Sequence, residues 1–301
     1  MYGVVALAKN AKSCTKNCKK SCLPECVPQQ DFFTAKTRMF CETGYAIIEE
    51  KETEKEGKTV EIIKTFTQQF RVMDTDCDLN GRMMPGAFLR MAQQISTDHC
   101  EAIGMNREFY EKNQAVFLMV KMAMEWKRVP EYGEVLTLTT MPETAKKITY
   151  KRATVVKDQK GNQIGLLDSR WVLVDMNTHR IIRRTPQAFA ELPFDEEVPF
   201  TLDMTLPKVQ DTVPVGHGKA QYTYCDTNYH LNNTRYADIV CDALPLEQMK
   251  QKSVTQMTIS YHNEIPVGHE FDLERAEVGE NTWYIVGSSQ GTRFFEALAK
   301  L

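Results

Sequence analysis

The sequence predicts an α+β fold made of two similar halves, each with a helix and an antiparallel sheet. In the first half, a strand-like run at 61–73 and then a helical segment precede strand-like runs at 116–126, 133–141, 146–156 and 163–176. After a proline-rich stretch the order recurs, with a strand at 219–225, a helix at 234–244 and strands at 254–262, 270–278, 282–290 and 292–300. One helix followed by consecutive antiparallel strands is typical of the α+β class. The recurrence of that order predicts an internal duplication.

The ends and the period of the first helix can be read from single residues. Pro85 suits a first turn, where its missing N–H is not needed. Met84, Phe88 and Met91 recur at helical spacing. Gly104 suits the stop, because glycine adopts the left-handed conformation that ends many helices.

Composition divides the chain into four segments. Residues 1–60 have no sustained apolar period, which predicts a poorly ordered extension. The first half follows at 61–185. Residues 186–216 contain five prolines and few periodic stretches, which predicts a linker. The second half spans 217–301.

The bulk properties favour a cytoplasmic protein. A net charge of −3 over 301 residues is too mild to indicate nucleic acid as the main partner. No apolar run approaches the roughly 20 residues that a membrane span needs. The opening residues lack the order of a signal peptide. We therefore expect a protein of the cytoplasm with reduced thiols and no membrane span.

Four cysteines near the start are evenly spaced: Cys14, Cys18, Cys22 and Cys26. Their spacing fits neither the common zinc pairs nor the ferredoxin run. Pro24 would also break a helix that aligned them. Metal binding is thus the less favoured interpretation, and we expect no metal and no organic cofactor.

The two halves share a motif between a strand and a helix. DTDCDLNG at 74–81 and DTNYHLNN at 226–233 have Asp, Thr, Leu and Asn at the same positions. The differences that bear on chemistry are Asp76 and Asp78 in the first copy, and Asn228 and His230 in the second.

A second match lies further along. EWKRVPEYGE at 125–134 is similar to YHNEIPVGHE at 261–270, with a proline after a comparable strand in both. This match puts Glu264 opposite Arg128. The second half therefore gathers polar groups that the first half lacks.

The gathered groups suit acyl transfer, which needs a base, an orienting partner and donors for the developing oxyanion. His230 and Glu264 supply proton acceptors, and Asn228 can hold a water or a carbonyl by its amide. Asp226 can orient Asn228. A helix starting near Asn232 would add free backbone N–H groups. The spacing alone also fits an alternative, in which these are ordinary turn and cap residues.

DTNYHLNNTRY at 226–236 resembles the Asp-x-Asn-x-His-x-Asn-Asn-x-x-Tyr signature of acyl-acyl-carrier-protein thioesterases of plants and bacteria. VPEYGEVLTLTT at 129–140 and DSRWVLVDMNTHRIIRRTP at 168–186 are similar to further motifs of that family, in the same order. The resemblance covers about residues 61–301. It implies a tandem hotdog fold, in which each half is a long helix packed on a curled antiparallel sheet.

The resemblance also implies roles for single residues. It places the acid, amide, imidazole and glutamate of the catalytic site on Asp226, Asn228, His230 and Glu264. Many plant members have a cysteine after the glutamate, where this chain has Ile265. A Cys–His mechanism is therefore excluded. The nucleophile is then water or a carboxylate, and the base is either Asp226 or Glu264.

The implied reaction is hydrolysis of a fatty acyl thioester of acyl carrier protein, giving free fatty acid and holo-carrier without a cofactor. The first half would bind the acyl chain, and Met84, Phe88 and Met91 could line its tunnel. Periodicity alone indicates that these three belong to the core. Arg180, Arg183 and Arg184 could dock an acidic carrier, or could form a solvated strand end.

Two other functions are compatible with the sequence. One is another hotdog enzyme, an acyl-CoA thioesterase or a dehydratase. The other is a non-catalytic protein that binds acyl carrier protein, which predicts tight binding without turnover. The sequence leaves the oligomeric state open, with a homodimer as one option.

Overall fold

The computed structural model describes residues 46–47 and 63–301. The helices in this part are α1 (Pro85–Ala102), α2 (Arg107–Asn113), α3 (Gln187–Ala190), α4 (Arg235–Asp242) and α5 (Leu246–Met249). The strands are β1 (Ala46–Ile47), β2 (Phe66–Arg71), β3 (Ala115–Trp126), β4 (Val135–Lys146), β5 (Thr149–Lys157), β6 (Gln163–Asp175), β7 (Val213–Lys219), β8 (Gln256–Tyr261), β9 (Glu270–Gly279), β10 (Thr282–Ser289) and β11 (Thr292–Lys300). The expected extension at 1–60 and its cysteines lie, apart from β1, outside the described residues.

One sheet runs through both halves, in the order β1-β2-β4-β5-β6-β3-β8-β11-β10-β9-β7. All its pairings between neighbours are antiparallel. Read outward from the centre, each half has the same order of strands, with β3 and β8 side by side. The two halves are therefore joined by strand hydrogen bonds and not merely by the linker.

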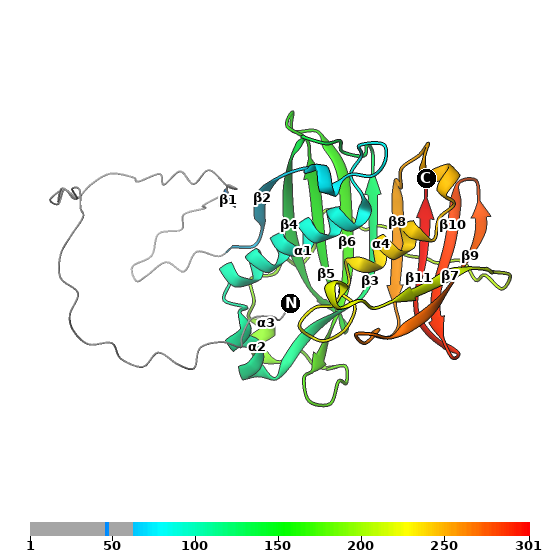
Figure 1. Cartoon of the computed structure of the whole chain (residues 1–301). Helices are drawn as coiled ribbons and strands as arrows, with labels where there is room; N and C mark the ends of the chain where they lie inside the picture. Colours follow the sequence, from blue (N-terminus) through cyan, green and yellow to red (C-terminus); the bar gives the residue numbers. More distant parts are fainter. Residues whose placement is uncertain (1–45, 48–62) are drawn as a thin grey trace, which may run out of the picture.

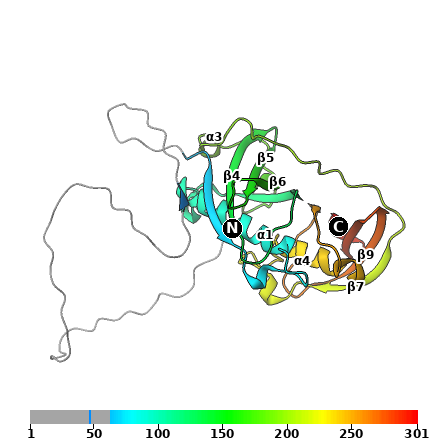
Figure 2. The same cartoon turned by 90° about the horizontal axis from the view of Figure 1, so that it is seen from above.

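The helices α1 and α4 lie on one face of this sheet (Figure 1). Phe88 on α1 and Tyr236 on α4 point into the main core, where both are buried. The connection from α3 to β7 passes outside the sheet, on the side away from both helices (Figure 2). The α+β class is confirmed, and the apolar periods of the helices face the sheet as amphipathic helices do.

The two helices differ in length. The predicted ends of α1 are confirmed, since Pro85 is its first residue and Gly104, with φ of 79°, follows its end. α1 has 18 residues, whereas α4 has 8. A long helix was expected in each half, and only the first half has one. Helix α4 stops shortly before Pro245, which cannot continue a helix.

α1 and α4 contact each other closely near their starts. Arg90 Nη1 lies 2.8 Å from Asp238 Oδ2. A Cβ on Gly86 would lie 1.7 Å from Asp238 Oδ1, so a larger residue there would have to displace the Asp238 carboxylate from its present position. No helix in the described part of the chain combines the length and the apolar character needed to cross a bilayer.

Candidate active site

The loop from Cys225 to Leu231 forms a closed turn before α4. Its two end residues make an isolated antiparallel bridge, and the N–H of Asp226 donates to the carbonyl of His230 at 3.1 Å. Within the loop, the N–H of Tyr229 donates to the carbonyl of Asp226 at 3.0 Å. Tyr229 has a left-handed φ of 63°, which lets the chain reverse tightly between the residues on either side of it.

Asp226 is held by neighbouring amides. Its Oδ1 accepts the backbone N–H of Asn228 at 2.9 Å, and its Oδ2 accepts the side-chain amide of Asn232 at 3.3 Å. Its Oδ1 also lies 3.9 Å from Nδ1 of His230. Because both oxygens already have donors, Asp226 is suited to orient the loop and the imidazole.

The imidazole of His230 lies between two carboxylates. Its Nε2 is 3.6 Å from Oε1 of Glu264, on the side opposite Asp226. The His230 side chain is 15% exposed and that of Glu264 is 52% exposed, so water reaches the glutamate more easily. Contacts of this length are common in acid–base sites without substrate and shorten when substrate binds.

Backbone pairing brings Glu264 to the loop. The N–H of Leu231 donates to the carbonyl of Ile265 at 2.8 Å, and the N–H of Val267 donates to the carbonyl of Tyr229 at 2.9 Å. The Ile265 side chain is fully buried in the core. The position of the plant cysteine is thus occupied by a core residue, and no thiol is available there.

Helix α4 begins within one residue of the predicted start at 234 and three residues after Asn232. Its first residue is Arg235, and Thr234 precedes it. The side-chain oxygen of Asn232 accepts the N–H of Thr234 at 3.0 Å and its hydroxyl at 2.7 Å. Asn232 therefore fixes the turn into the helix, and the next residue, Asn233, lies against the cavity described below.

The structure corrects the alignment of the two copies. Cys77 and Met83 form the same bridge as Cys225 and Leu231, so the copies are offset by 148 positions and not by 152. In this alignment the first loop has Asp78, Asn80, Gly81 and Arg82 where the second has Asp226, Asn228, Tyr229 and His230. The sequence match of Asn228 and His230 with Asp76 and Asp78 was wrong, because shared letters outweighed the pairing that closes the loop.

The hydrogen bonds of the two loops agree with this register. The N–H of Asn80 donates to Oδ1 of Asp78 at 2.8 Å, as Asn228 does to Asp226. Gly81 has φ of 72°, matching the 63° of Tyr229. The aspartate and the asparagine are therefore present in both halves, and the histidine is replaced by Arg82 in the first.

The counterpart of Glu264 also changes. The N–H of Met83 donates to the carbonyl of Pro130 at 2.8 Å, as Leu231 does to Ile265. Glu264 is thus equivalent to Val129 and not to Arg128. Pro130 and Pro266, which guided the sequence match, are therefore not equivalent in the structure, because Pro130 corresponds to Ile265.

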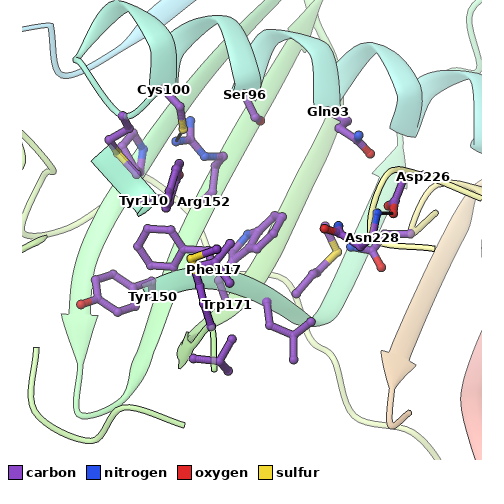
Figure 3. A pocket seen from close by; sticks show the side chains of 18 of the residues that line it. Gln93, Ser96, Cys100, Tyr110, Phe117, Tyr150, Arg152, Trp171, Asp226 and Asn228 are labelled. Carbon is purple, nitrogen blue, oxygen red and sulfur yellow. Dashed lines mark hydrogen bonds between the residues drawn. The ribbon is translucent and has the colours of Figure 1, made fainter. Parts of the chain in front are cut away.

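A cavity of about 310 Å³ lies between the second-half loop and the first half. All four predicted catalytic residues, Asp226, Asn228, His230 and Glu264, line it. Its other walls come from α1, α2 and the first-half strands, with Gln93, Ser96, Cys100, Tyr110, Phe117, Tyr150, Arg152 and Trp171 among the lining residues. Figure 3 shows Asp226 and Asn228 at one end and the aromatic side chains at the other.

The α1 residues predicted to line an acyl tunnel do not line this cavity. Phe88 is fully buried and packs on Trp126 at a ring separation of 4.6 Å, and Met84 and Met91 pack against the main core. The cavity uses a different stripe of the same helix, Gln93, Ser96 and Cys100. Apolar periodicity marks the face that fills the core, and these polar and small residues carry no such signal.

The predicted docking arginines lie beside the cavity and not in it. Arg180, Arg183 and Arg184 are exposed and follow the end of β6. His179, next to them, does line the cavity. The sequence gives no signal for this placement, because a lone histidine has no ligand spacing.

The aromatic end of the cavity borders a buried polar cluster around Arg152. Nη1 of Arg152 lies 3.1 Å from Nδ1 of His99 and donates to Oγ1 of Thr140 at 3.2 Å. Burial, and then the charge of Arg152, lower the pKa of His99 to about 4. His99 is therefore neutral near pH 7, with Nδ1 accepting from Arg152 and Nε2 donating to the carbonyl of Ile63 at 3.1 Å.

Within residues 46–47 and 63–301, no three His, Cys, Asp or Glu side chains are grouped to hold a metal ion.

Comparison with known proteins gives two family matches. The family models for the acyl-ACP thioesterase N-terminal domain and C-terminal domain match residues 63–192 and 215–295. Oleoyl-acyl carrier protein thioesterase 2, chloroplastic, from Arabidopsis thaliana is 22% identical over 229 residues, covering 69% of this chain and 62% of the relative. The chain thus spans about three fifths of the length of that relative.

Solved structures support the fold. An acyl-ACP thioesterase from Bacteroides thetaiotaomicron aligns with a TM-score of 0.71 at 23% identity, covering 79% of this chain and 97% of that one. The 12:0-ACP thioesterase from Umbellularia californica aligns with a TM-score of 0.71 at 16% identity, covering 78% and 96%. The tandem hotdog architecture is thereby confirmed. Because the two family models match in order and cover both halves of the sheet, this chain belongs to the acyl-ACP thioesterase family.

Proposed function

We propose that this chain hydrolyses fatty acyl thioesters of acyl carrier protein, releasing free fatty acid and the carrier thiol. The observation that carries the proposal is the placement of Asp226, Asn228, His230 and Glu264 at one end of a cavity whose far end is aromatic. A chain that enters this cavity would bring its thioester carbon beside the polar groups. Family membership agrees with this reaction.

In the proposed mechanism Glu264 is the base. Its carboxylate accepts no hydrogen bond from the described residues, whereas both oxygens of Asp226 already have donors. Glu264 takes a proton from water, the water oxygen bonds to the carbonyl carbon, and the carbon–sulfur bond then breaks. The carrier thiolate recovers the proton from the glutamic acid, directly or through His230. Water is consumed, and acid and thiol are the products.

Asn228 is the proposed oxyanion donor. Its side-chain amide lines the cavity, and its backbone is fixed by Asp226 at 2.9 Å. One such donor is typically worth about 10²–10³ in rate. Its held position means that little reorganisation is needed when charge develops on the carbonyl oxygen.

For the carrier, we propose docking at Arg180, Arg183 and Arg184. They are exposed at the end of β6, next to cavity residues. Substituting all three by glutamate should raise KM for carrier-linked substrate more than for the coenzyme A thioester, and the difference should shrink at high salt. We place the reaction in the cytoplasm and leave a homodimer as an assembly to be tested by sedimentation.

The test is fatty acid release from a panel of acyl-carrier-protein and acyl-CoA thioesters. His230→Ala and Glu264→Ala should each lower kcat/KM by about a hundredfold or more. The matched controls are Arg82→Ala and Val129→Ala, at the equivalent positions of the first half, which should keep the wild-type rate. If the control variants lose as much activity as His230→Ala and Glu264→Ala, the proposed catalytic roles of His230 and Glu264 are contradicted.

The rival functions give other outcomes. Preference for coenzyme A thioesters would make the chain an acyl-CoA thioesterase. Tight binding of acylated carrier without release of acid, in wild type and variants alike, would make it a non-catalytic binding protein.

A further inference from the structure

Arg152 stands at the end of the cavity opposite the catalytic residues. It is 8% exposed and lines the cavity. On β5 it pairs with Pro142 on one side and Ser169 on the other. Its Nη2 lies 3.5 Å from Sγ of Cys100 on α1, and Figure 3 shows the two side by side, away from Asp226 and Asn228.

The groups around this guanidinium are all neutral. They are the unprotonated His99, the hydroxyl of Thr140 and the thiol of Cys100. Among residues 46–47 and 63–301, no carboxylate lies within ion-pair distance of Arg152. A buried charge without a counter-ion is costly and rare in proteins unless a ligand supplies the partner.

The carboxylates on the neighbouring strands do not serve Arg152. Glu143 pairs with Lys146, and Asp168 pairs with Arg170 and lies 3.7 Å from Lys151. Lys151 precedes Arg152 on β5, and successive side chains on a strand point to opposite faces. Both acids are thus paired with other cations, and neither forms an ion pair with Arg152.

Arg152 has donors to spare. A guanidinium carries five N–H groups, and three interactions with neighbouring atoms are seen, two from Nη1 and one from Nη2. The N–H of Nε and one N–H of Nη2 have no acceptor in the described part of the chain. Together these two form the fork that binds both oxygens of a carboxylate.

The distance to the catalytic end sets a chain length. Figure 3 shows Gln93 on the side of Asn228 and Cys100 beside Arg152. The two are seven residues apart on α1, which corresponds to about 10 Å along the helix at about 1.5 Å per residue. A chain of carbon–carbon bonds about 1.5 Å long advances about 1.3 Å per carbon, so about eight carbons cover this span.

We propose that Arg152 binds an oxygen-bearing far end of the acyl chain, a terminal carboxylate being the best fit, on chains of about eight carbons. This inference rests on the proposed function for where the thioester lies. The substrate class would then be acyl groups with a polar terminus, whereas a methyl terminus would leave the two donors and the charge of Arg152 unpaired.

The test compares three chains of equal length on the full protein: octanoyl, 8-hydroxyoctanoyl and octanedioyl. Each is presented as a carrier thioester for hydrolysis and as a non-cleavable pantetheine amide for calorimetric binding. Wild type should favour the octanedioyl chain over octanoyl by at least about tenfold, with the hydroxyl between them. Arg152→Gln should abolish or reverse this ratio, and Lys157→Gln, exposed on the same strand, should leave it unchanged.

Ratios within one variant are insensitive to partial loss of folded protein. Equal or better binding of octanoyl by wild type, or a ratio that Arg152→Gln does not change, would overturn the inference. If the amides bind with the expected ratio but no thioester is cleaved, the inference about Arg152 is supported and the proposed hydrolase function is contradicted. If thioesters are cleaved with a preference for the octanoyl chain, the proposed hydrolase function is supported and the inference about Arg152 is contradicted.

Discussion

The loops 77–83 and 225–231 follow the same backbone path, closed by the same bridge and the same aspartate-to-amide hydrogen bond. They face different surroundings. In the first, Asp78 accepts from the hydroxyl of Ser253 and Asn80 donates to the carbonyl of Met249, so the loop is used for packing. The second loop faces the cavity. The aspartate and the asparagine thus belong to the loop architecture, and the residues at 230 and 264 are what distinguish the halves chemically.

Helices α1 and α4 also differ, and here the first half has the additional part. By the offset of 148 positions, α4 corresponds to residues 87–94 of α1, so 95–102 have no helical counterpart. Ser96 and Cys100, which line the cavity, lie in that extra part. One half therefore supplies the wall of the cavity and the other supplies the polar groups at its end.

The strongest challenge to this division is a graft. Arg82→His and Val129→Glu, added to His230→Ala, rebuild the catalytic pair in the first loop. We expect activity to stay about a hundredfold or more below wild type, because this loop packs on Met249 and Ser253. The same two substitutions in an otherwise wild-type chain control for folding. Recovered hydrolysis would mean that the loops are interchangeable.

The extra part of α1 also predicts a pH effect on stability. His99 has a pKa of about 4 in the folded protein and about 6.5 when unfolded. As pH falls below 6.5 the unfolded chain takes up the proton first, so the free energy of unfolding decreases toward pH 4. Between pH 8 and pH 5 we expect a loss of about 2 kcal/mol from this residue.

Urea unfolding of wild type and His99→Gln at both pH values measures that loss. Glutamine can still accept from Arg152, so the variant should lose about 2 kcal/mol less than wild type over the interval. Identical losses in the two proteins would show that His99 is not held neutral.

Filling the cavity from α1 tests its role as a wall. Ser96→Leu places added carbon atoms beside the cavity, which should lower kcat/KM for longer chains relative to shorter ones by about tenfold. The ratio of octanoyl to butanoyl hydrolysis measures the change, with thermal unfolding as the check on folding. An unchanged ratio would mean that the acyl chain lies elsewhere.

The smallest expected effect compares the left-handed positions of the loops. Gly81 adopts φ of 72° without strain, whereas Tyr229 at 63° carries a side chain there. Tyr229→Gly should stabilise by up to about 1 kcal/mol, and Gly81→Ala should destabilise by about 1 kcal/mol or more. Denaturant unfolding measures both, and changes of the same sign would contradict the equivalence of the positions.

Much of the fold follows from local signals. Pro85 and Gly104 mark the ends of α1, and most of the strand-like runs become strands of the sheet. The strand predicted at 219–225 was wrong, because β7 lies at Val213–Lys219 and Tyr222–Tyr224 forms a 3₁₀ helix. The short α4 does not follow from them, because the apolar pattern at 234–244 continues beyond Asp242. Where that helix ends depends on packing around Pro245.

The candidate site is predictable in part. Asp226, Asn228, His230 and Glu264 line one cavity as the motif implies. The alignment with the first half failed because it counted identical letters, whereas the bridges at Cys77 and Cys225 set the true register. The cavity walls could not be predicted, because Ser96 and Cys100 are ordinary residues until the fold leaves space beside them.

The pairing of β3 with β8 has a consequence for how the sequence of this chain can vary. Ala123 on β3 pairs with Thr258 on β8, its own counterpart by the offset of 135 positions that relates Val129 to Glu264. A dimer of identical chains joined in this way would have to change both copies with every mutation. Here one chain contains both copies, so the sequence of each copy can change independently of the other. The covalent link also keeps the two halves together at any dilution, so the candidate site cannot be lost by dissociation of the two halves that form it.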